Sequence, residues 1–109
     1  MEFDKVTEKQ IQELQSMEQN IQGLLMQKQT LQLELTEAEN ALIEVEKTNS
    51  EVYKITGQIM VPKNKKELEA ELKERKDIIS LRLKAISNQE NTLSKEAEDL
   101  RKEVISKIK

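Results

Sequence analysis

Residues 52–62 read VYKITGQIMVP and interrupt two long stretches of helical periodicity. The segment is rich in β-branched side chains, which favour strands, and Gly57 followed by Gln58 is typical of a turn between strands. We therefore expect short strands at residues 52–56 and 59–61, within a β-hairpin that covers residues 51–62.

The loop length decides which side chains the hairpin presents on each face. A two-residue loop pairs Ile55 with Met60, whereas a three-residue loop pairs Ile55 with Ile59. We prefer the three-residue loop because it gathers large apolar side chains on one face, namely Tyr53, Ile55, Ile59 and Val61.

Upstream of the hairpin, apolar residues recur at alternating spacings of three and four. This stripe consists of Leu14, Met17, Ile21, Leu24, Lys28, Leu31, Leu35, Ala38, Leu42 and Val45, with Lys28 as its polar member. Such a pattern, kept over more than four heptads, is typical of the seam of a coiled coil. It predicts a first helix over residues 5–48.

Downstream of the hairpin, a second stripe has the same alternating spacing. Its members are Leu72, Lys76, Ile79, Leu83, Ile86, Glu90, Leu93, Ala97, Leu100 and Val104. Asn64 stands three residues before Glu67, as in a capping box at the start of a helix. We therefore expect a second helix over residues 65–108.

The short connector requires the two helices to fold back on each other along their stripes. The predicted fold is mainly α: a single domain, residues 1–109, in which a long antiparallel coiled-coil hairpin of two helices is joined by a short β-hairpin. This pairing places Lys28 near Ile86 or Glu90. Lys28 then either pairs with Glu90 or extends its aliphatic stem towards water, and either arrangement makes a polar layer in the seam.

Composition excludes several classes of function. The 109 residues contain no His and no Cys, and the two glycines, Gly23 and Gly57, lie far apart. Thiol or imidazole catalysis, His- or Cys-bound metals and a Gly-rich phosphate loop are therefore not expected, so we predict no enzyme and no cofactor. The apolar runs are too short for a membrane span or a secretory signal, and we expect a cytoplasmic protein.

Nucleic acid is also an improbable partner for this chain. The net charge is −3 and only two residues are aromatic, whereas nucleic-acid binding needs a basic surface and benefits from stacking side chains. A nucleic-acid-binding coiled-coil arm is therefore disfavoured.

A lone two-stranded hairpin is marginal in water, and its edges carry unpaired backbone groups. This hairpin also carries more apolar surface than a simple connection between helices needs. We therefore expect hairpins of several chains to assemble into an intersubunit β-barrel. The alternative is a hairpin that packs on the helix ends of its own chain.

Apolar residues also gather near the two chain ends, where the coiled coil finishes. They are Phe3, Val6, Ile11, Val104, Ile105 and Ile108. Exposed apolar side chains at such tips suit weak contact with partners that lack a fixed shape. Alternatively, they only close the last turns of the coil, and Val104 and Ile105 cannot both face the seam.

The order of helix, single hairpin and helix resembles the β-class subunit of prefoldin. The resemblance rests on VYKITGQIMV at residues 52–61 and on the glutamine-rich run QKQTLQLELTEAENALIEVEK at residues 27–47, and it extends over nearly the whole chain. Pro62 departs from the family pattern, so the resemblance does not fix the length of the second strand.

The resemblance implies a hexamer of two α-class and four β-class subunits, whose hairpins form a platform. In such a complex the coiled-coil tips hold non-native client proteins and deliver them to a group II chaperonin without nucleotide. Platform residues would then be Tyr53, Ile55, Gly57, Ile59 and Val61, and client contacts would be the six tip residues. A structural spacer or tether without client binding is the alternative function.

Overall fold

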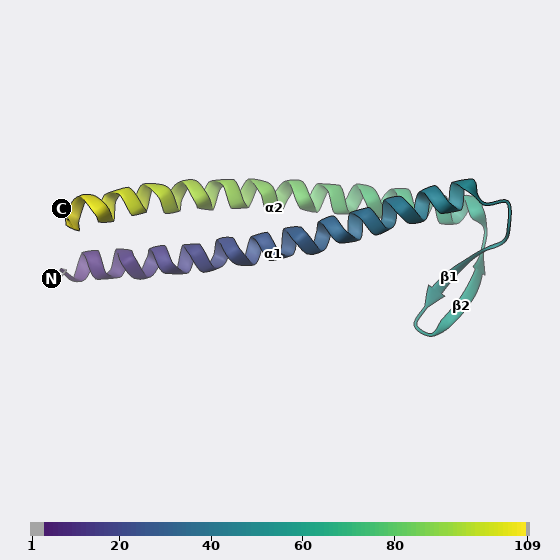
Figure 1. Cartoon of the computed structure of the whole chain (residues 1–109), viewed down its shortest axis with the longest axis horizontal. Coiled ribbons are helices and arrows are strands. Elements are labelled where there is room, and N and C mark those ends of the chain that lie inside the picture. Colours follow the sequence, from purple (N-terminus) through teal and green to yellow (C-terminus); the bar gives the residue numbers. More distant parts are fainter. Residues whose placement is uncertain (1–3, 109) are drawn as a thin grey trace. The chain divides into compact units, whose positions relative to one another are not determined.

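The structure is a computed structural model that describes residues 4–108. Helix α1 spans Lys5–Lys47, strand β1 Val52–Thr56, strand β2 Ile59–Lys63 and helix α2 Lys65–Ile108 (Figure 1). The prediction of two long helices with one β-hairpin between them is confirmed.

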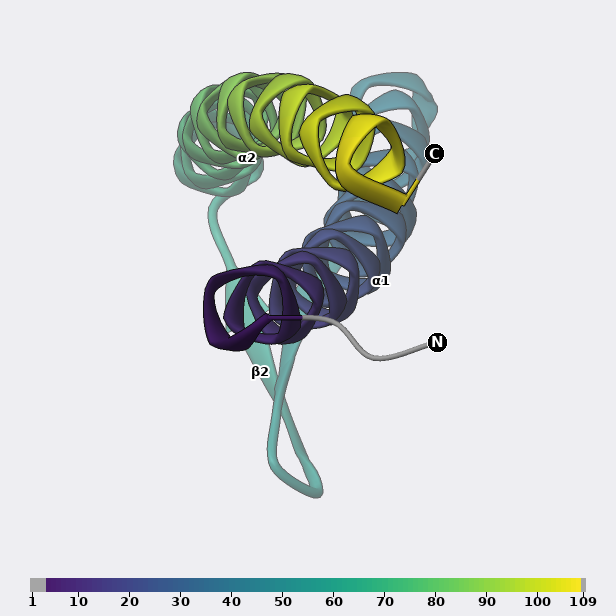
Figure 2. The ribbon, with the colours of Figure 1, turned by 90° about the vertical axis from the view of Figure 1, so that its left-hand side faces the viewer.

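The described chain divides into two compact units. The terminal unit contains residues up to Gln29 and from Lys84 onwards, and the hairpin unit contains Thr30–Leu83. In the terminal unit, the start of α1 lies beside the end of α2, as both ribbon views show (Figures 1 and 2). Each unit therefore contains a segment of both helices.

Short polar side chains begin both helices, as helix N-termini require. Asp4 Oδ1 accepts the N–H of Thr7 at 2.6 Å, and Asn64 Oδ1 accepts the N–H groups of Lys66 at 2.8 Å and Glu67 at 3.3 Å. The expected Asn64 cap is confirmed. The backbone hydrogen bond from Thr7 lowers the pKa of Asp4, because it favours the ionised carboxylate.

The two stripes predicted from the heptads are the buried faces of the helices. Every member of both stripes is buried or half-buried, whereas most other helical residues are exposed. In the hairpin unit, the buried apolar residues are Leu31, Ala38, Leu42, Val52, Leu68 and Ile79; in the terminal unit they are Ala97 and Val104. Spacing of three and four residues keeps one narrow face of each helix out of water.

The hairpin has a two-residue loop, so the preferred three-residue register is wrong. Ile55 pairs with Met60 and Thr56 with Ile59, around Gly57 and Gln58. Gly57 has φ +63° and no other described residue has positive φ, the pattern of a type II′ turn with Gly at its first central position. This turn matches the twist of paired strands, and that preference outweighs the gathering of apolar side chains.

The observed register distributes the apolar side chains over both faces. Residues that pair across strands share a face, and faces alternate along each strand. One face, termed the uncharged face, presents Tyr53, Ile55, Met60 and Pro62; the opposite face, termed the lysine face, presents Val52, Lys54, Thr56, Ile59, Val61 and Lys63. Ile59 and Val61 therefore do not share a face with Tyr53 and Ile55.

Strand β2 continues through Pro62 to Lys63, so the expectation that it ends at residue 61 is also wrong. In a two-residue hairpin, the pair that flanks the loop is hydrogen-bonded and the pairs then alternate. The Tyr53–Pro62 pair falls at a position without ladder hydrogen bonds. Proline is tolerated there because that position requires no N–H donor.

Candidate functional site

The hairpin presents most of its large side chains to solvent. Exposed fractions are 71% for Ile55, 67% for Ile59 and 64% for Met60, and Tyr53 and Val61 are exposed as well. Four of the five predicted platform residues are thus large exposed side chains, and the fifth, Gly57, forms the turn. Two strands alone cannot bury such a surface.

One ion pair attaches the hairpin to α2, and a lysine at the start of α2 contacts the end of α1. Lys54 Nζ lies 3.2 Å from Glu71 Oε2 in α2, and Val52 at the start of β1 is buried. Lys65 Nζ donates to the carbonyl oxygens of Thr48 and Glu46 at the end of α1, at 2.9 and 3.2 Å. The uncharged face is left without such ties, apart from the Tyr53 hydroxyl, which donates to Glu51 Oε2 at 2.7 Å.

An open groove of about 750 Å³ lies between β1 and the helices of the hairpin unit. The hairpin contributes Tyr53, Lys54 and Ile55, all from β1. The helices line it with charged residues and with six apolar residues, Ala41, Val45, Leu68, Leu72, Ile78 and Ile79. This groove was not predicted from the sequence. The residue that could have indicated it is Ile78, an apolar residue beside the α2 stripe.

The predicted tip residues fall into four groups. Val6 is 60% exposed, Ile105 43% and Ile108 38%, while Ile11 is half-buried. Val104 is only 5% exposed because it belongs to the α2 stripe. Ile105, the next residue along the helix, lies outside that stripe and is exposed. Phe3 lies outside the described residues.

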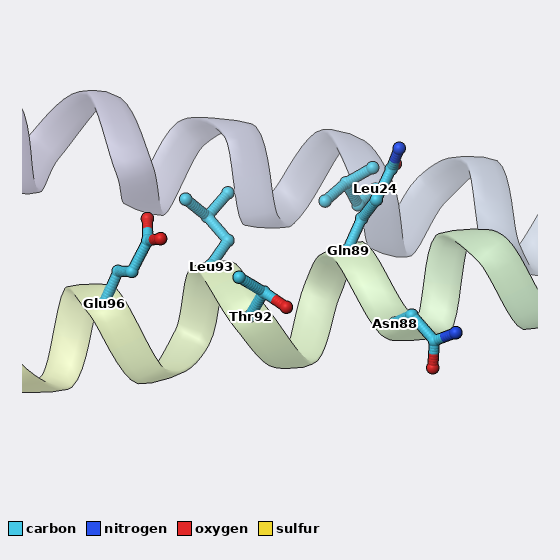
Figure 3. Close-up of a pocket in the computed structure, with 6 residues that line it drawn as sticks. All are labelled: Leu24, Asn88, Gln89, Thr92, Leu93 and Glu96. Carbon is cyan, nitrogen blue, oxygen red and sulfur yellow. The ribbon is translucent and has the colours of Figure 1, made fainter.

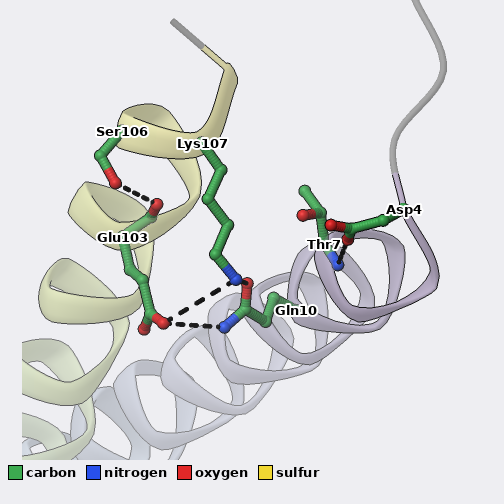
Figure 4. Close-up of polar contacts among 6 residues, drawn as sticks. All are labelled: Asp4, Thr7, Gln10, Glu103, Ser106 and Lys107. Atoms are coloured by element: carbon green, nitrogen blue, oxygen red, sulfur yellow. Dashed lines mark hydrogen bonds and ion pairs between the residues drawn. The ribbon is translucent and has the colours of Figure 1, made fainter.

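Polar side chains join the two helices next to these tip residues (Figure 4). Gln10 Nε2 donates to Glu103 Oε1 at 3.1 Å, and Lys107 Nζ donates to Gln10 Oε1 at 2.8 Å. Ser106 Oγ donates to the Glu103 carbonyl oxygen at 2.7 Å. The two contacts of Gln10 hold the end of α2 against the start of α1, so the exposed apolar side chains are presented from paired helices.

The polar layer in the seam is an ion pair. Lys28 Nζ lies 3.6 Å from Glu90 Oε2 in the terminal unit. Of the two arrangements expected from the sequence, the structure therefore has the pairing of Lys28 with Glu90. Glu90 Oε2 is buried and has no hydrogen-bond partner. The layer therefore costs stability while it favours one register, as polar seam positions do.

A second hollow of about 460 Å³ lies in the terminal unit (Figure 3). Leu24 of α1 and Leu93 of α2 border it, with Asn88, Gln89, Thr92 and Glu96 along α2. Glu96 is the one ionisable side chain that lines it.

Comparison with known proteins identifies the family. A family model described as prefoldin subunit matches residues 8–109. The prefoldin subunit beta of Thermococcus kodakarensis is 37% identical over 99 residues, which cover 89% of this chain and 85% of that protein. The chain belongs to the prefoldin family, in its β-subunit class.

Other prefoldin β subunits support the same assignment. That of Methanococcoides burtonii is 35% identical over 105 residues, covering 94% of this chain and 90% of the relative. The crystal structure of the prefoldin beta subunit from Thermococcus strain KS-1 matches with a TM-score of 0.87 and 34% identity, covering 96% of this chain and 94% of that one. The resemblance stated from the sequence is therefore confirmed.

Neither helix, over the residues that the structure describes, has a stretch apolar and long enough to cross a membrane.

Proposed function

We propose that this chain is a subunit of an ATP-independent cytoplasmic chaperone. It holds unfolded or nascent proteins at the ends of its paired helices and passes them to a group II chaperonin. Membership of the prefoldin β class over nearly the whole chain is the observation that carries this proposal. Exposed apolar side chains at the chain ends support it, because contact of that kind needs neither a nucleotide nor a shaped pocket.

The proposed assembly is a hexamer of two α-class and four β-class subunits, joined through the hairpins. Large apolar side chains on both hairpin faces support association through this element. Strands from other subunits would pair with its open edges and remove the apolar surface from water, as closure into a barrel does. The platform residues remain Tyr53, Ile55, Gly57, Ile59 and Val61.

The proposed client contacts are centred on Val6, Ile105 and Ile108, which are exposed. Phe3 and Ile11 stay in the proposed set. Val104 acts through the seam, because its side chain is buried between the helices and is not available to a client.

The proposal is tested by suppression of aggregation of a chemically denatured test protein by the assembled complex. The triple variant Val6→Ser, Ile105→Ser, Ile108→Ser should lose most of the suppression, while circular dichroism shows intact helices. A matched control replaces Leu33 and Leu81, exposed apolar residues of the hairpin unit, by Ser. It should retain activity.

Equal suppression by the tip variant and the wild type would contradict client holding at the tips and favour a structural spacer. Hand-off is measured separately, as transfer of a labelled denatured protein from the assembled complex to a group II chaperonin.

A further inference from the structure

The seam is loosely packed part-way along the terminal unit. Leu24 of α1 and Leu93 of α2 border the hollow of about 460 Å³, so each lacks packing contacts on that side (Figure 3). Seam residues of α1 between 21 and 28 and of α2 between 86 and 93 are all only half-buried. Nearer the chain ends, Ala97 and Val104 of the same α2 stripe are buried. We call α1 residues 21–28 and α2 residues 86–94 the loose level.

Both helices contain weak helix formers at the loose level. Gly23 adjoins Leu24 in α1, and α2 residues 87–94 read SNQENTLS. Glycine, serine, asparagine and threonine are less favourable in a helix interior than alanine. Packing does not require Gly23, because a Cβ there would meet no atom within 4 Å and its φ is not positive. The glycine therefore weakens α1 at the level where α2 is also weak.

The polar contact of the loose level gives little resistance to opening. Lys28 Nζ lies 3.6 Å from Glu90 Oε2, too far for a hydrogen bond, and this oxygen is buried without a hydrogen-bond partner. Opening of the seam would return the oxygen to water. Its hydration would offset part of the cost of separating the apolar seam residues.

The helices are joined more firmly nearer the chain ends, in α1 residues 5–18 and α2 residues 96–108, which we call the distal segment. Arg101 Nη2 donates to Glu18 Oε1 at 2.9 Å, and Gln10 bonds to Glu103 and Lys107 as described above. Residues 95–104 of α2 read KEAEDLRKEV and are mostly strong helix formers. Each exposed polar contact is weak alone, but together they oppose the fraying expected of helix ends.

We infer that the loose level is a pivot within the terminal unit. The seam opens there more often than in the distal segment, so the distal segment tilts as one paired piece. Under the proposed function, this motion would carry Val6, Ile105 and Ile108 onto clients of different shape without separating the helices that bear them. That use rests on the proposed function, whereas the pivot itself does not.

Hydrogen exchange of backbone amides in the full chain, followed by mass spectrometry, tests the pivot. Exchange is compared with that of the same peptides in the unfolded chain, which corrects for sequence. Slowing should be smaller by about tenfold or more at the loose level than in the distal segment, because local opening sets the rate. Equal slowing, or faster exchange in the distal segment, would overturn the inference.

Substitution by alanine tests the cause of the opening. Gly23→Ala and Asn91→Ala should each slow exchange at the loose level by about three- to fivefold and leave the distal segment unchanged. The matched control is Ser80→Ala, which replaces an exposed weak helix former of α2 in the hairpin unit and should not affect the loose level. Equal slowing along the whole chain by Gly23→Ala would show a general stabilisation and would overturn the pivot.

Spin labels test whether the distal segment stays paired. The sequence has no Cys, so labels attach only to introduced cysteines. Distances measured by double electron–electron resonance should be narrowly distributed for Lys9→Cys with Lys102→Cys and broader for Gln22→Cys with Asn91→Cys. A broader distribution for the distal pair would overturn the inference.

These measurements need no client, so they are separate from the test of the proposed function. A pivot in a chain whose assembled complex suppresses no aggregation would overturn the proposed function and support the pivot. Suppression by a complex whose chain lacks the exchange difference would do the opposite.

Discussion

The ammonium group of Lys65, the first residue of α2, lies 2.9 Å from the carbonyl oxygen of Thr48, just beyond the end of α1. It also donates to the carbonyl oxygen of Glu46 at 3.2 Å. The last carbonyl groups of a helix lack partners and carry partial negative charge, so a cation is favourable there. One side chain thus links the two helices where the β-hairpin leaves them.

Replacing Lys65 by Ala should lower the free energy of unfolding by about 1 kcal/mol, because the α1 carbonyl groups lose their cation. Urea unfolding followed by circular dichroism measures this change. Lys66→Ala is the matched control, since Lys66 is exposed and its side chain makes no described contact with α1. Equal losses in the two variants would show that Lys65 does not cap α1.

The two glycines should respond to alanine with opposite signs. A Cβ added at either position would meet no atom within 4 Å, so only backbone conformation decides the outcome. Gly57→Ala should destabilise the hairpin by about 1–2 kcal/mol because the turn needs positive φ. Gly23→Ala should stabilise α1 by about 0.5–1 kcal/mol, since glycine weakens a helix interior. Thermal unfolding of each single variant measures its change in stability. Changes of the same sign in the two variants would contradict this explanation.

The seam ion pair should be replaceable by apolar residues. Lys28→Leu alone should destabilise the chain, because it removes the cation that faces the buried Oε2 atom of the half-buried Glu90. The double variant Lys28→Leu, Glu90→Leu should be more stable than the wild type by about 1–2 kcal/mol, as apolar seam layers usually are. A double-mutant cycle in urea measures the coupling. A double variant no more stable than the wild type would show that the layer is not a cost.

The cap at Asp4 should give the start of α1 a pH dependence. Its pKa is lowered in the folded chain, so the cap contributes above the usual pKa of an aspartate and is lost as the pH falls through the lowered value. The chemical shift and exchange rate of the Thr7 amide report this loss. Asp4→Asn should keep the cap without the pH dependence, whereas Asp4→Ala should fray the first turn at every pH. A pH-independent Thr7 amide in the wild type would disprove the role of the carboxylate.

A charge on the uncharged face of the hairpin should disperse the assembly more than a charge on the lysine face. Ile55 and Ile59 are almost equally exposed and lie on opposite faces. The lysine face already carries Lys54 and Lys63, so we expect the uncharged face to line the platform interior. Ile55→Asp should therefore cost several kcal/mol of assembly free energy and Ile59→Asp less. Sedimentation measures the particle mass of each variant. A larger loss of mass with Ile59→Asp would show that the lysine face, and not the uncharged face, lines the platform interior.

Heptad spacing predicted most of the buried helical residues, although Thr7 and Leu68 are buried outside the two stripes. It placed Val104 in the α2 stripe and left Ile105 outside, and the structure shows this difference in exposure. It also brought Lys28 within reach of Glu90. These predictions succeed because a seam of 3.5 residues per repeat is a local, periodic property of each helix.

The register of the hairpin was not predictable from its apolar content. Grouping Ile55 with Ile59 maximised apolar contact within one chain, but that surface is exposed in the structure and did not decide the register. The conformational freedom of Gly57 at the first central position decided it. The groove beside Ile78 was missed because it depends on the direction in which the hairpin leaves the helices, which no spacing encodes.

Pro62 also bears on the period before a newly made chain meets other subunits. For identical hairpins to stack into a fibril, both edges of each hairpin must pair with a strand of another copy, as in amyloid. An edge that lacks one N–H donor pairs poorly with another strand, so fibril growth at the β2 edge is disfavoured. Pro62, which β2 tolerates, is therefore expected to disfavour fibril growth at the β2 edge of an unassembled chain.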